Sequence, residues 1–172
     1  MADLFQVINE RSSIRGYKPE MLTKDEIDLL VKAGLQAPTA RNEQEIHISV
    51  VNTSNPVVKE IQQALNPDAK NTFYYDAPVL FFLSGKDDFK WSKLDAGIAV
   101  ENMQLAAKGA GLGSVILGCI DAILLQDKKA YFNGKLGIPE GYSFAIALAA
   151  GYPNVEKAPH EIDIKANVSY VD

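Results

Sequence analysis

Apolar residues recur at helical spacing in several parts of the chain, and local signals mark where these helices begin and end. Residues 4–9 carry apolar positions three and four apart, which is typical of one face of a short helix. Thr23 and Glu26 form the pattern of a capping box, so a second helix is predicted to begin after Thr23 and to stop before Pro38. Asn55-Pro56 predicts the start of a third helix, since an asparagine cap followed by proline is a preferred beginning.

Apolar runs without helical spacing predict the strands. The run 79–83 is continuous, as expected of a strand that is covered on both faces, and 114–117 and 144–149 predict two more buried strands. Residues 46–50 instead alternate between apolar and more polar side chains, which also favours a strand. Between 79–83 and 114–117 we expect a long helix at about 92–108, closed by a glycine.

A further helix is expected around 123–132, so helices alternate with strands along most of the chain. That order predicts an α/β or α+β fold in which one layer of sheet is flanked by helices. Because no repeat, linker or low-complexity segment interrupts it, residues 1–172 are predicted to form a single domain.

The C-terminal segment has a different pattern. Gly151-Tyr152-Pro153 breaks the last buried run, and apolar residues then alternate with polar ones from Ile162 to Tyr170. A period of two predicts a strand with one covered face. It would be either an edge strand of the chain's own sheet or an arm given to a partner subunit, and the sequence leaves both open.

The composition is that of an ordinary soluble globular protein, with 47% hydrophobic and 23% charged residues. A net charge of −5 argues against nucleic acid as an electrostatic partner, and no apolar run approaches the roughly 20 residues that cross a bilayer. The N-terminus has no leader-like pattern, and the single cysteine, Cys119, cannot form an internal disulfide. We therefore expect a cytoplasmic protein without membrane spans.

The three arginines are concentrated in two polar motifs near the N-terminus, whereas every other basic residue is lysine. Arg11 and Arg15 bracket Arg11-Ser12-Ser13-Ile14-Arg15, and Arg41 lies within 37–44. A guanidinium offers a planar fork of donors that suits phosphate, and it stacks on flat rings. The first motif is thus a good set of donors for one phosphate-bearing ligand. The alternative is a helix that simply ends in polar residues.

Other chemistry finds little support in the sequence. The glycines of 109–113 follow a helix and precede a strand, the reverse of a dinucleotide-binding fingerprint, so helix capping explains them better. His47 and His160 are far apart and form no metal-ligand cluster, and His47 is interpreted as an ordinary strand residue. Cys119 has no histidine nearby in the sequence to activate it. If the protein is an enzyme, a bound cofactor therefore carries its chemistry.

Five motifs in order resemble the nitroreductase-like FMN-dependent flavoproteins of the small, 170-residue class. These motifs are Arg11-x-Ser13-x-Arg15 with Tyr17, Ala37-Pro38-Thr39-x-x-Asn42-x-Gln44, Ala77-Pro78, Gly111-Leu112-Gly113-Ser114 and Gly151-Tyr152-Pro153. The resemblance implies an α+β fold with a central, mostly antiparallel sheet flanked by helices. It also implies a homodimer with FMN at the subunit interface, in which the exchange of the C-terminal arm between subunits stays open.

The same resemblance implies an enzyme that takes hydride from NAD(P)H and reduces nitroaromatics, quinones or similar acceptors by a ping-pong mechanism. Its residues for FMN would be Arg11, Ser12, Ser13 and Arg15 for the phosphate, ribityl chain and ring edge; Pro38, Thr39, Asn42 and Gln44 toward the partner's flavin; Leu117 and Gly118 across the ring; and Lys157 and His160 for the phosphate. No side chain is assigned a catalytic role, because the flavin would carry the reaction.

Several positions depart from the family pattern. Ser12 stands where a second arginine is frequent, Glu45-Ile46 replaces proline plus an aromatic residue, and His160 follows the last proline where arginine is usual. Phe73-Tyr74-Tyr75 is open to two interpretations, a substrate wall or core packing. Two other functions stay open: a flavin-binding or sensing protein with little turnover, and a flavin-free dimeric scaffold.

Overall fold

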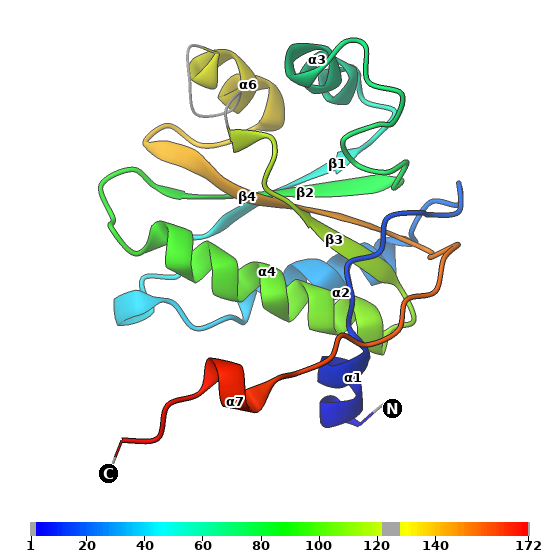
Figure 1. Ribbon diagram of the computed structural model, residues 1–172. Helices are drawn as coiled ribbons and strands as arrows, with labels where there is room; N and C mark the ends of the chain where they lie inside the picture. The colour runs from blue at the N-terminus through cyan, green and yellow to red at the C-terminus, as the bar shows by residue number, and fades with distance from the viewer. Residues whose placement is uncertain (1–2, 122–127, 172) are drawn as a thin grey trace.

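A four-stranded antiparallel sheet forms the centre of the molecule, in a computed structural model that describes residues 3–121 and 128–171 (Figure 1). Across the sheet the strands follow the order β1 (His47–Asn52), β2 (Val79–Lys86), β4 (Tyr142–Gly151) and β3 (Gly113–Leu117). The α+β fold with an antiparallel sheet is therefore confirmed. The two short strands, β1 and β3, form the edges.

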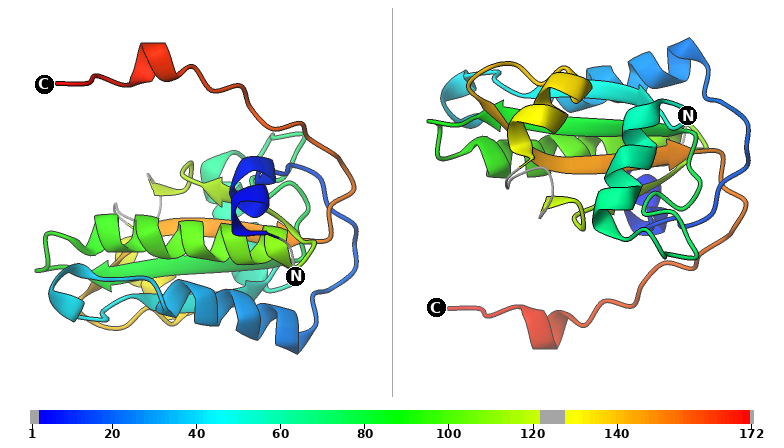
Figure 2. Two further views of the ribbon diagram at one scale, coloured as in Figure 1. Left: turned by 90° about the horizontal axis from the view of Figure 1, so that it is seen from below. Right: turned by 90° about the horizontal axis from the view of Figure 1, so that it is seen from above.

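Helices cover both faces of this sheet (Figures 1 and 2). The described helices are α1 (Leu4–Glu10), α2 (Lys24–Leu35), α3 (Pro56–Leu65), α4 (Ser92–Gly109), α6 (Lys129–Leu136) and α7 (Ile164–Asn167), with a 3-10 turn η1 (Ala40–Asn42), and four of them cover the sheet. α2 and α4 lie on one face, and α3 and α6 lie on the other. The predicted starts are confirmed: Thr23 and Glu26 form a complete capping box, and the Asn55 side chain accepts from the N–H of Val57.

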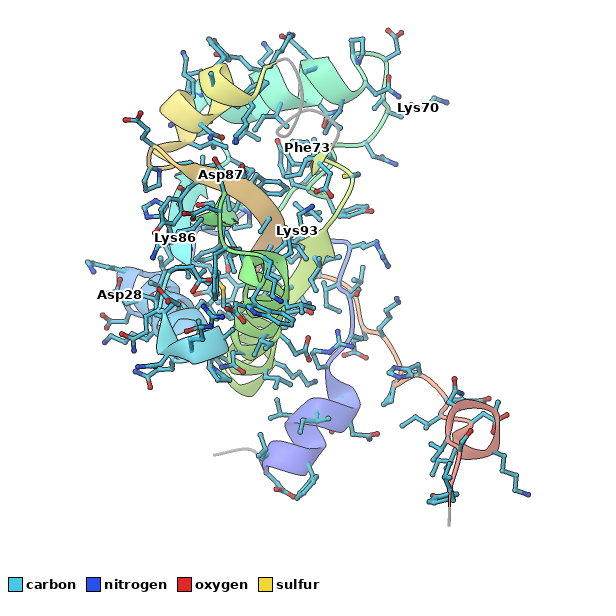
Figure 3. The ribbon with its side chains drawn as sticks, turned by 90° about the vertical axis from the view of Figure 1, so that its left-hand side faces the viewer. Asp28, Lys70, Phe73, Lys86, Asp87 and Lys93 are labelled. Carbon is cyan, nitrogen blue, oxygen red and sulfur yellow. The ribbon has the colours of Figure 1, made fainter. Side chains whose placement is uncertain are left out.

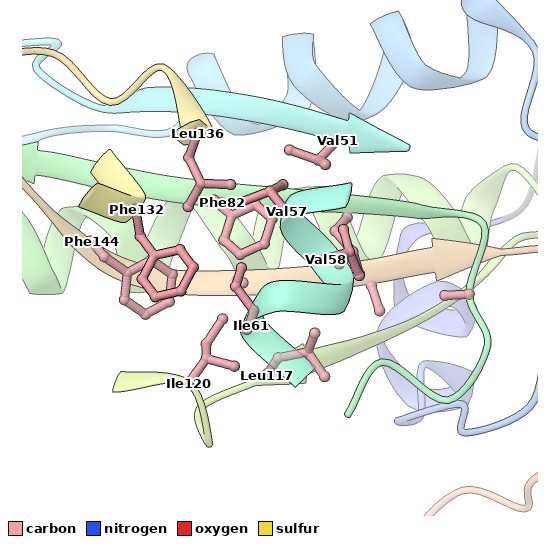
Figure 4. Close-up of a cluster of buried hydrophobic side chains, with 14 of the residues drawn as sticks. Val51, Val57, Val58, Ile61, Phe82, Leu117, Ile120, Phe132, Leu136 and Phe144 are labelled. Atoms are coloured by element: carbon pink, nitrogen blue, oxygen red, sulfur yellow. The ribbon is translucent and has the colours of Figure 1, made fainter. Parts of the chain in front are cut away.

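The continuous apolar run of β2 divides its side chains between two cores. Leu80 and Phe82 face the core under α3 and α6, which Figure 4 shows in close-up. Phe81 and Leu83 face the core under α2 and α4. Each of these four side chains is 0% exposed, which explains why this strand carries no polar alternation.

Of the two alternatives for the C-terminal segment, the edge strand of the chain's own sheet is wrong, and the arm given to a partner subunit stays a prediction. Residues 164–167 form the single helical turn α7, whose first turn is capped by Asp163 accepting from the N–H of Ala166 at 3.1 Å. The segment extends away from the sheet (Figure 2), so it pairs with neither of the edge strands β1 and β3. Its apolar side chains are left in solvent: Ile162 is 72% and Tyr170 is 83% exposed.

The predicted helix at 123–132 falls partly on residues 122–127, which lie outside the described residues; the described part, α6, begins at Lys129 and ends at Leu136. In the described portion of the chain, no helix is both long and apolar enough to cross a membrane.

Candidate functional site

The first arginine motif is fixed to the free edge of β3. After α1 the chain runs beside this strand, where Ser13 forms a parallel bridge to Ser114 and the N–H of Ile14 donates to the Ser114 carbonyl at 2.9 Å. Gly113 permits this approach, because a Cβ there would lie 2.9 Å from the Ile14 side chain. The interpretation of this motif as a mere polar helix end is therefore incomplete, since the motif is also part of the sheet edge.

Tyr17 secures the far end of the motif. Its buried hydroxyl donates to the carbonyl of Ile14 at 2.8 Å, and the carbonyl of Ala149 in β4 lies 3.4 Å away. Burial raises the pKa of Tyr17, so this hydroxyl remains a donor at neutral pH. Tyr17 also forms an antiparallel bridge with Pro153, which joins the N-terminal motif to the start of the C-terminal arm, the described residues 153–171.

A cleft of about 290 Å³ opens beside this motif, between the ends of α1 and α4, the start of β3 and the first residues of the arm. Its basic lining residues are Arg11, Lys108 and Lys157, joined by the hydroxyl-bearing Ser12 and Ser114. At its base the buried Gln104 side chain donates to the Ser114 hydroxyl at 3.3 Å. Three cations and two hydroxyls therefore converge on one open site.

Carboxylates partly balance the charge of this cleft. Arg11 Nε lies 3.5 Å from Glu101 Oε1, and Lys108 Nζ lies 3.0 Å from Glu10 Oε2. Hydrogen bonds from Gln6 and then Lys108 lower the pKa of Glu10, so it is ionised at neutral pH. Glu156 also lines the cleft. Such partly exposed ion pairs are weak, so an incoming anion can replace the carboxylates at little cost.

Arg15 lies outside this cleft. It is exposed and helps line a second hollow of about 210 Å³, where its guanidinium lies 5.7 Å from the centre of the Tyr75 ring. Tyr75 and Asp76 both have left-handed backbone, with φ of 54° and 61°. Phe73, Tyr74 and Tyr75 pack partly against the core under α3 and α6, which agrees with core packing, and the Tyr75 ring also lies near Arg15.

The second motif lies at the opposite end of α4 from the first (Figure 1). Thr39 and Gln44 line a hollow of about 200 Å³ under the end of α2, and the Thr39 hydroxyl accepts from the N–H of Gln44 at 2.9 Å. Arg41, Asn42 and Gln44 all have left-handed backbone, with φ between 50° and 57°. Pro38 and Asn42 are exposed. Within one chain, the two predicted halves of the site are therefore not brought together.

The remaining predicted residues are spread over β3 and the arm. The Leu117 side chain is buried in the core under α3 and α6, and Gly118 follows it in an exposed position. The Ser114 carbonyl points away from β4, toward the open edge of β3. Because successive residues of an antiparallel strand direct their N–H and C=O groups to opposite sides, those of Ile116, two residues farther on, also point to the open edge. Lys157 lines the cleft, whereas His160 is exposed farther along the arm.

Lys108 and Gln104 are cleft residues that the sequence analysis did not identify. The glycines of 109–113, which follow these two residues, are the sequence feature that could have indicated their place. The interpretation of these glycines as a helix cap is confirmed, since α4 ends at Gly109 and Gly111 has a φ of 76°. This turn directs the chain straight back into β3. The last turn of α4 is thereby placed beside Arg11.

Comparison with known proteins identifies relatives along the whole chain. Residues 8–152 match the sequence model described as the nitroreductase family. A protein of Archaeoglobus fulgidus, named provisionally as an NADH dehydrogenase/NAD(P)H nitroreductase, is 31% identical over 97% of this chain and 95% of its own length. The NADPH-type FMN reductase of Bacillus subtilis is 29% identical over 89% of this chain and 67% of its own.

A solved structure shares the fold. The nitroreductase with bound FMN from Desulfitobacterium hafniense DCB-2 superposes with a TM-score of 0.87 at 25% identity, covering 100% of both chains.

Proposed function

This chain belongs to the nitroreductase family, and on that premise we propose that it is an FMN-dependent oxidoreductase that uses NADH or NADPH as electron donor. Two relatives support this assignment: one is named an FMN reductase that uses NADPH, and one was solved as a nitroreductase with bound FMN. FMN, when bound, supplies the redox chemistry, accepting hydride from the nicotinamide and returning electrons to an acceptor.

The observation that carries the proposal is the cleft with its three cations. Arg11, Lys108 and Lys157 around one open site suit the phosphate of FMN, and the Ser12 hydroxyl adds a neutral donor. Ser13 would contact the ribityl chain. The exposed Arg15 would lie by the pyrimidine edge of the ring, where a fixed positive charge favours the reduced, anionic form of a flavin.

Gly118 and the open edge of β3 would hold the ring itself. A glycine has no side chain to keep a flat ligand away from the backbone, and Gly118 has open space where a Cβ would be. The N–H groups that point outward from β3 would then be donors to the ring nitrogens. Leu117 would support this edge from the core below it.

The site also needs a second copy of the chain. The motif with Pro38, Thr39, Asn42 and Gln44 lies at the far end of α4, so a dimer that crosses this helix would bring it to the flavin held by the other copy. Exposed apolar side chains support such an interface, since Phe5 is 77% exposed on α1 and Leu94 is 60% exposed on α4. The exposed apolar arm, with His160 on it, would pack against the partner.

We infer a ping-pong reaction in which NAD(P)H enters and leaves before the acceptor occupies the same open pocket. The acceptors proposed are nitroaromatics, quinones or similar flat, electron-poor molecules. A single domain over residues 1–172 and a cytoplasmic setting complete the proposal.

The experiment is a visible absorption spectrum of the purified protein, followed by NAD(P)H oxidation with and without an added quinone or nitroaromatic. We expect a flavin spectrum, oxidation that depends on the acceptor, and parallel lines in double-reciprocal plots. Bound flavin without acceptor-dependent oxidation would instead favour a flavin-binding or sensing protein. A colourless protein that ignores added FMN would favour a scaffold and overturn the proposal.

A further inference from the structure

Glu45 is a buried acid at the junction between the second motif and β1. Glu45 is only 4% exposed, and neither oxygen of its carboxylate has a hydrogen-bond partner among the described residues. Burial disfavours an ionised carboxylate in such a place, because it loses its water; the nearby N–H of Glu45 itself, which is not close or aligned enough for a hydrogen bond, offsets this loss only in part. A protonated acid, in contrast, brings its own donor.

The group that faces Glu45 is another acid. Asp95, in the first turn of α4, is 3% exposed and lies close enough for its carboxylate to interact with that of Glu45. Burial first, and then the charge and contact of Asp95, raise the pKa of Glu45. Two acceptor groups that meet in a buried place form a favourable contact only when one proton lies between them.

Two groups act against Asp95 and lower the pKa of Glu45: the N–H of Glu45 itself and, more weakly, Lys86. Lys86, which ends β2 and is labelled in Figure 3, also pairs with another carboxylate, since its Nζ lies 3.5 Å from Glu43 Oε2. His47 is half-buried two positions farther along in β1. From α2, the residues that line the adjacent hollow are uncharged: Gly34 and Leu35.

Asp95 is also the residue that fastens the second motif. Its Oδ2 accepts from the N–H of Ala40 at 3.0 Å, directly before Arg41, Asn42 and Gln44, which have left-handed backbone. Such conformations persist only where surrounding contacts impose them. The contacts within the loop are backbone bonds from Asn42 to Thr39 and from Glu43 to Ala40, together with the Thr39 bond to Gln44, whereas the Asp95 bond to Ala40 ties the loop to α4.

We propose that Glu45 is a positioning residue that works in its protonated form: it donates a hydrogen bond to Asp95, and this proton keeps Asp95 in place to hold the loop 39–44 in the shape that presents Asn42 and Gln44. Loss of the proton leaves two negative charges in one buried place. One carboxylate must then turn toward water, which frees Ala40 and lets the left-handed segment relax. The expected effect on FMN affinity rests on the proposed function, whereas the protonation of Glu45 does not.

The sign of the pH dependence follows from the raised pKa. A group whose pKa is higher in the folded chain stabilises the fold fully below its ordinary value of 4.5, and this contribution is lost as the pH rises through the folded value. The affinity for FMN should fall over the same range, with a limit of about tenfold per pH unit for a single proton.

The test compares wild type with Glu45→Gln, which keeps the shape and can donate to Asp95 but cannot titrate. Glu43→Gln is the matched control, because it removes an exposed carboxylate two residues away. Three quantities are measured: the pH profile of unfolding without flavin, the FMN dissociation constant against pH, and the infrared C=O stretch of a protonated carboxylic acid. We expect a wild-type acid band that is missing in Glu45→Gln, and pH slopes present in wild type and Glu43→Gln but absent in Glu45→Gln.

Equal pH slopes in wild type and Glu45→Gln, or a wild-type spectrum in which no Glu45 acid band persists above the ordinary carboxyl pKa of 4.5, would overturn the proposal. If Glu45→Gln does not fold, the variant Asp95→Asn replaces it in the test. The asparagine keeps an acceptor for the N–H of Ala40 and offers Glu45 a donor. The acid band and the pH slopes should therefore be absent in Asp95→Asn. A chain that binds no FMN at any pH defeats the proposed function, while the unfolding profile and the infrared band still decide the role of the proton.

Discussion

The guanidinium of Arg11, where α1 ends, lies 3.5 Å from the Glu101 carboxylate in the middle of α4. The Arg11 side chain is 21% and that of Glu101 46% exposed, so water screens the pair and its contribution to stability is small. A phosphate in the cleft would compete with Glu101 for the same guanidinium. This relationship yields two opposite predictions for FMN affinity.

Arg11→Ala should weaken FMN binding by about 1.5–3 kcal/mol, the usual size of a hydrogen bond to a charged group. Isothermal titration calorimetry of the flavin-free protein measures the change. Lys59→Ala, which removes an exposed cation on α3 across the sheet, should leave the affinity unchanged. Wild-type affinity in Arg11→Ala would show that the phosphate is held elsewhere.

Glu101→Gln should tighten FMN binding, because it removes the competing carboxylate and leaves Arg11 free to meet the phosphate. The gain should be at most about 1 kcal/mol, as for other partly exposed ion pairs. It should disappear in the double variant Arg11→Ala/Glu101→Gln, which the same titration tests. Weaker binding by Glu101→Gln alone would mean that Glu101 positions Arg11 rather than competing for it.

Gly113→Ala should destabilise the chain by about 1–3 kcal/mol, the usual cost of overpacking. The added Cβ would lie 2.9 Å from Ile14 Cγ2 and push the first arginine motif away from β3. Urea unfolding followed by circular dichroism measures the free energy. Gly134→Ala in α6 is the matched control, since its Cβ meets nothing within 4 Å, and alanine should stabilise that helix by about 0.5–1 kcal/mol.

Leu94→Glu should convert the proposed dimer to monomers and abolish tight FMN binding in the same step. It places a charge on an exposed apolar position of α4, which is 60% exposed in the single chain. Analytical ultracentrifugation gives the mass, and Lys59→Glu on α3 should remain dimeric. A Leu94→Glu variant that stays dimeric would place the interface on a different surface.

Local signals were enough to predict most of the fold. The Thr23–Glu26 capping box and the Asn55 cap depend on residues three or fewer positions apart, and both are present as predicted. The run of β2 also needed no partner to be recognised, because both of its faces are buried. The prediction of an edge strand at the C-terminus was wrong for the opposite reason. Alternating apolar residues form a strand only where another strand edge pairs with them, and in this chain Asp163 caps a helical turn instead.

The site was only partly predictable, because it is made by contacts between distant segments. The sequence identified Arg11 and Lys157, which the structure brings to one cleft. Lys108 was missed, since its place beside Arg11 depends on the sharp turn at Gly111 and on the packing of α1 against α4. The burial of Glu45 likewise depends on Asp95, fifty residues away on another element.

The most direct test of the central claim compares the binding of FMN and riboflavin, which lacks the phosphate, to the flavin-free protein by fluorescence quenching. The cleft around Arg11, Lys108 and Lys157 predicts one FMN per chain, bound more tightly than riboflavin, with most of that preference lost in Arg11→Ala. Equal affinity for the two flavins, or a preference that survives Arg11→Ala unchanged, would contradict the account.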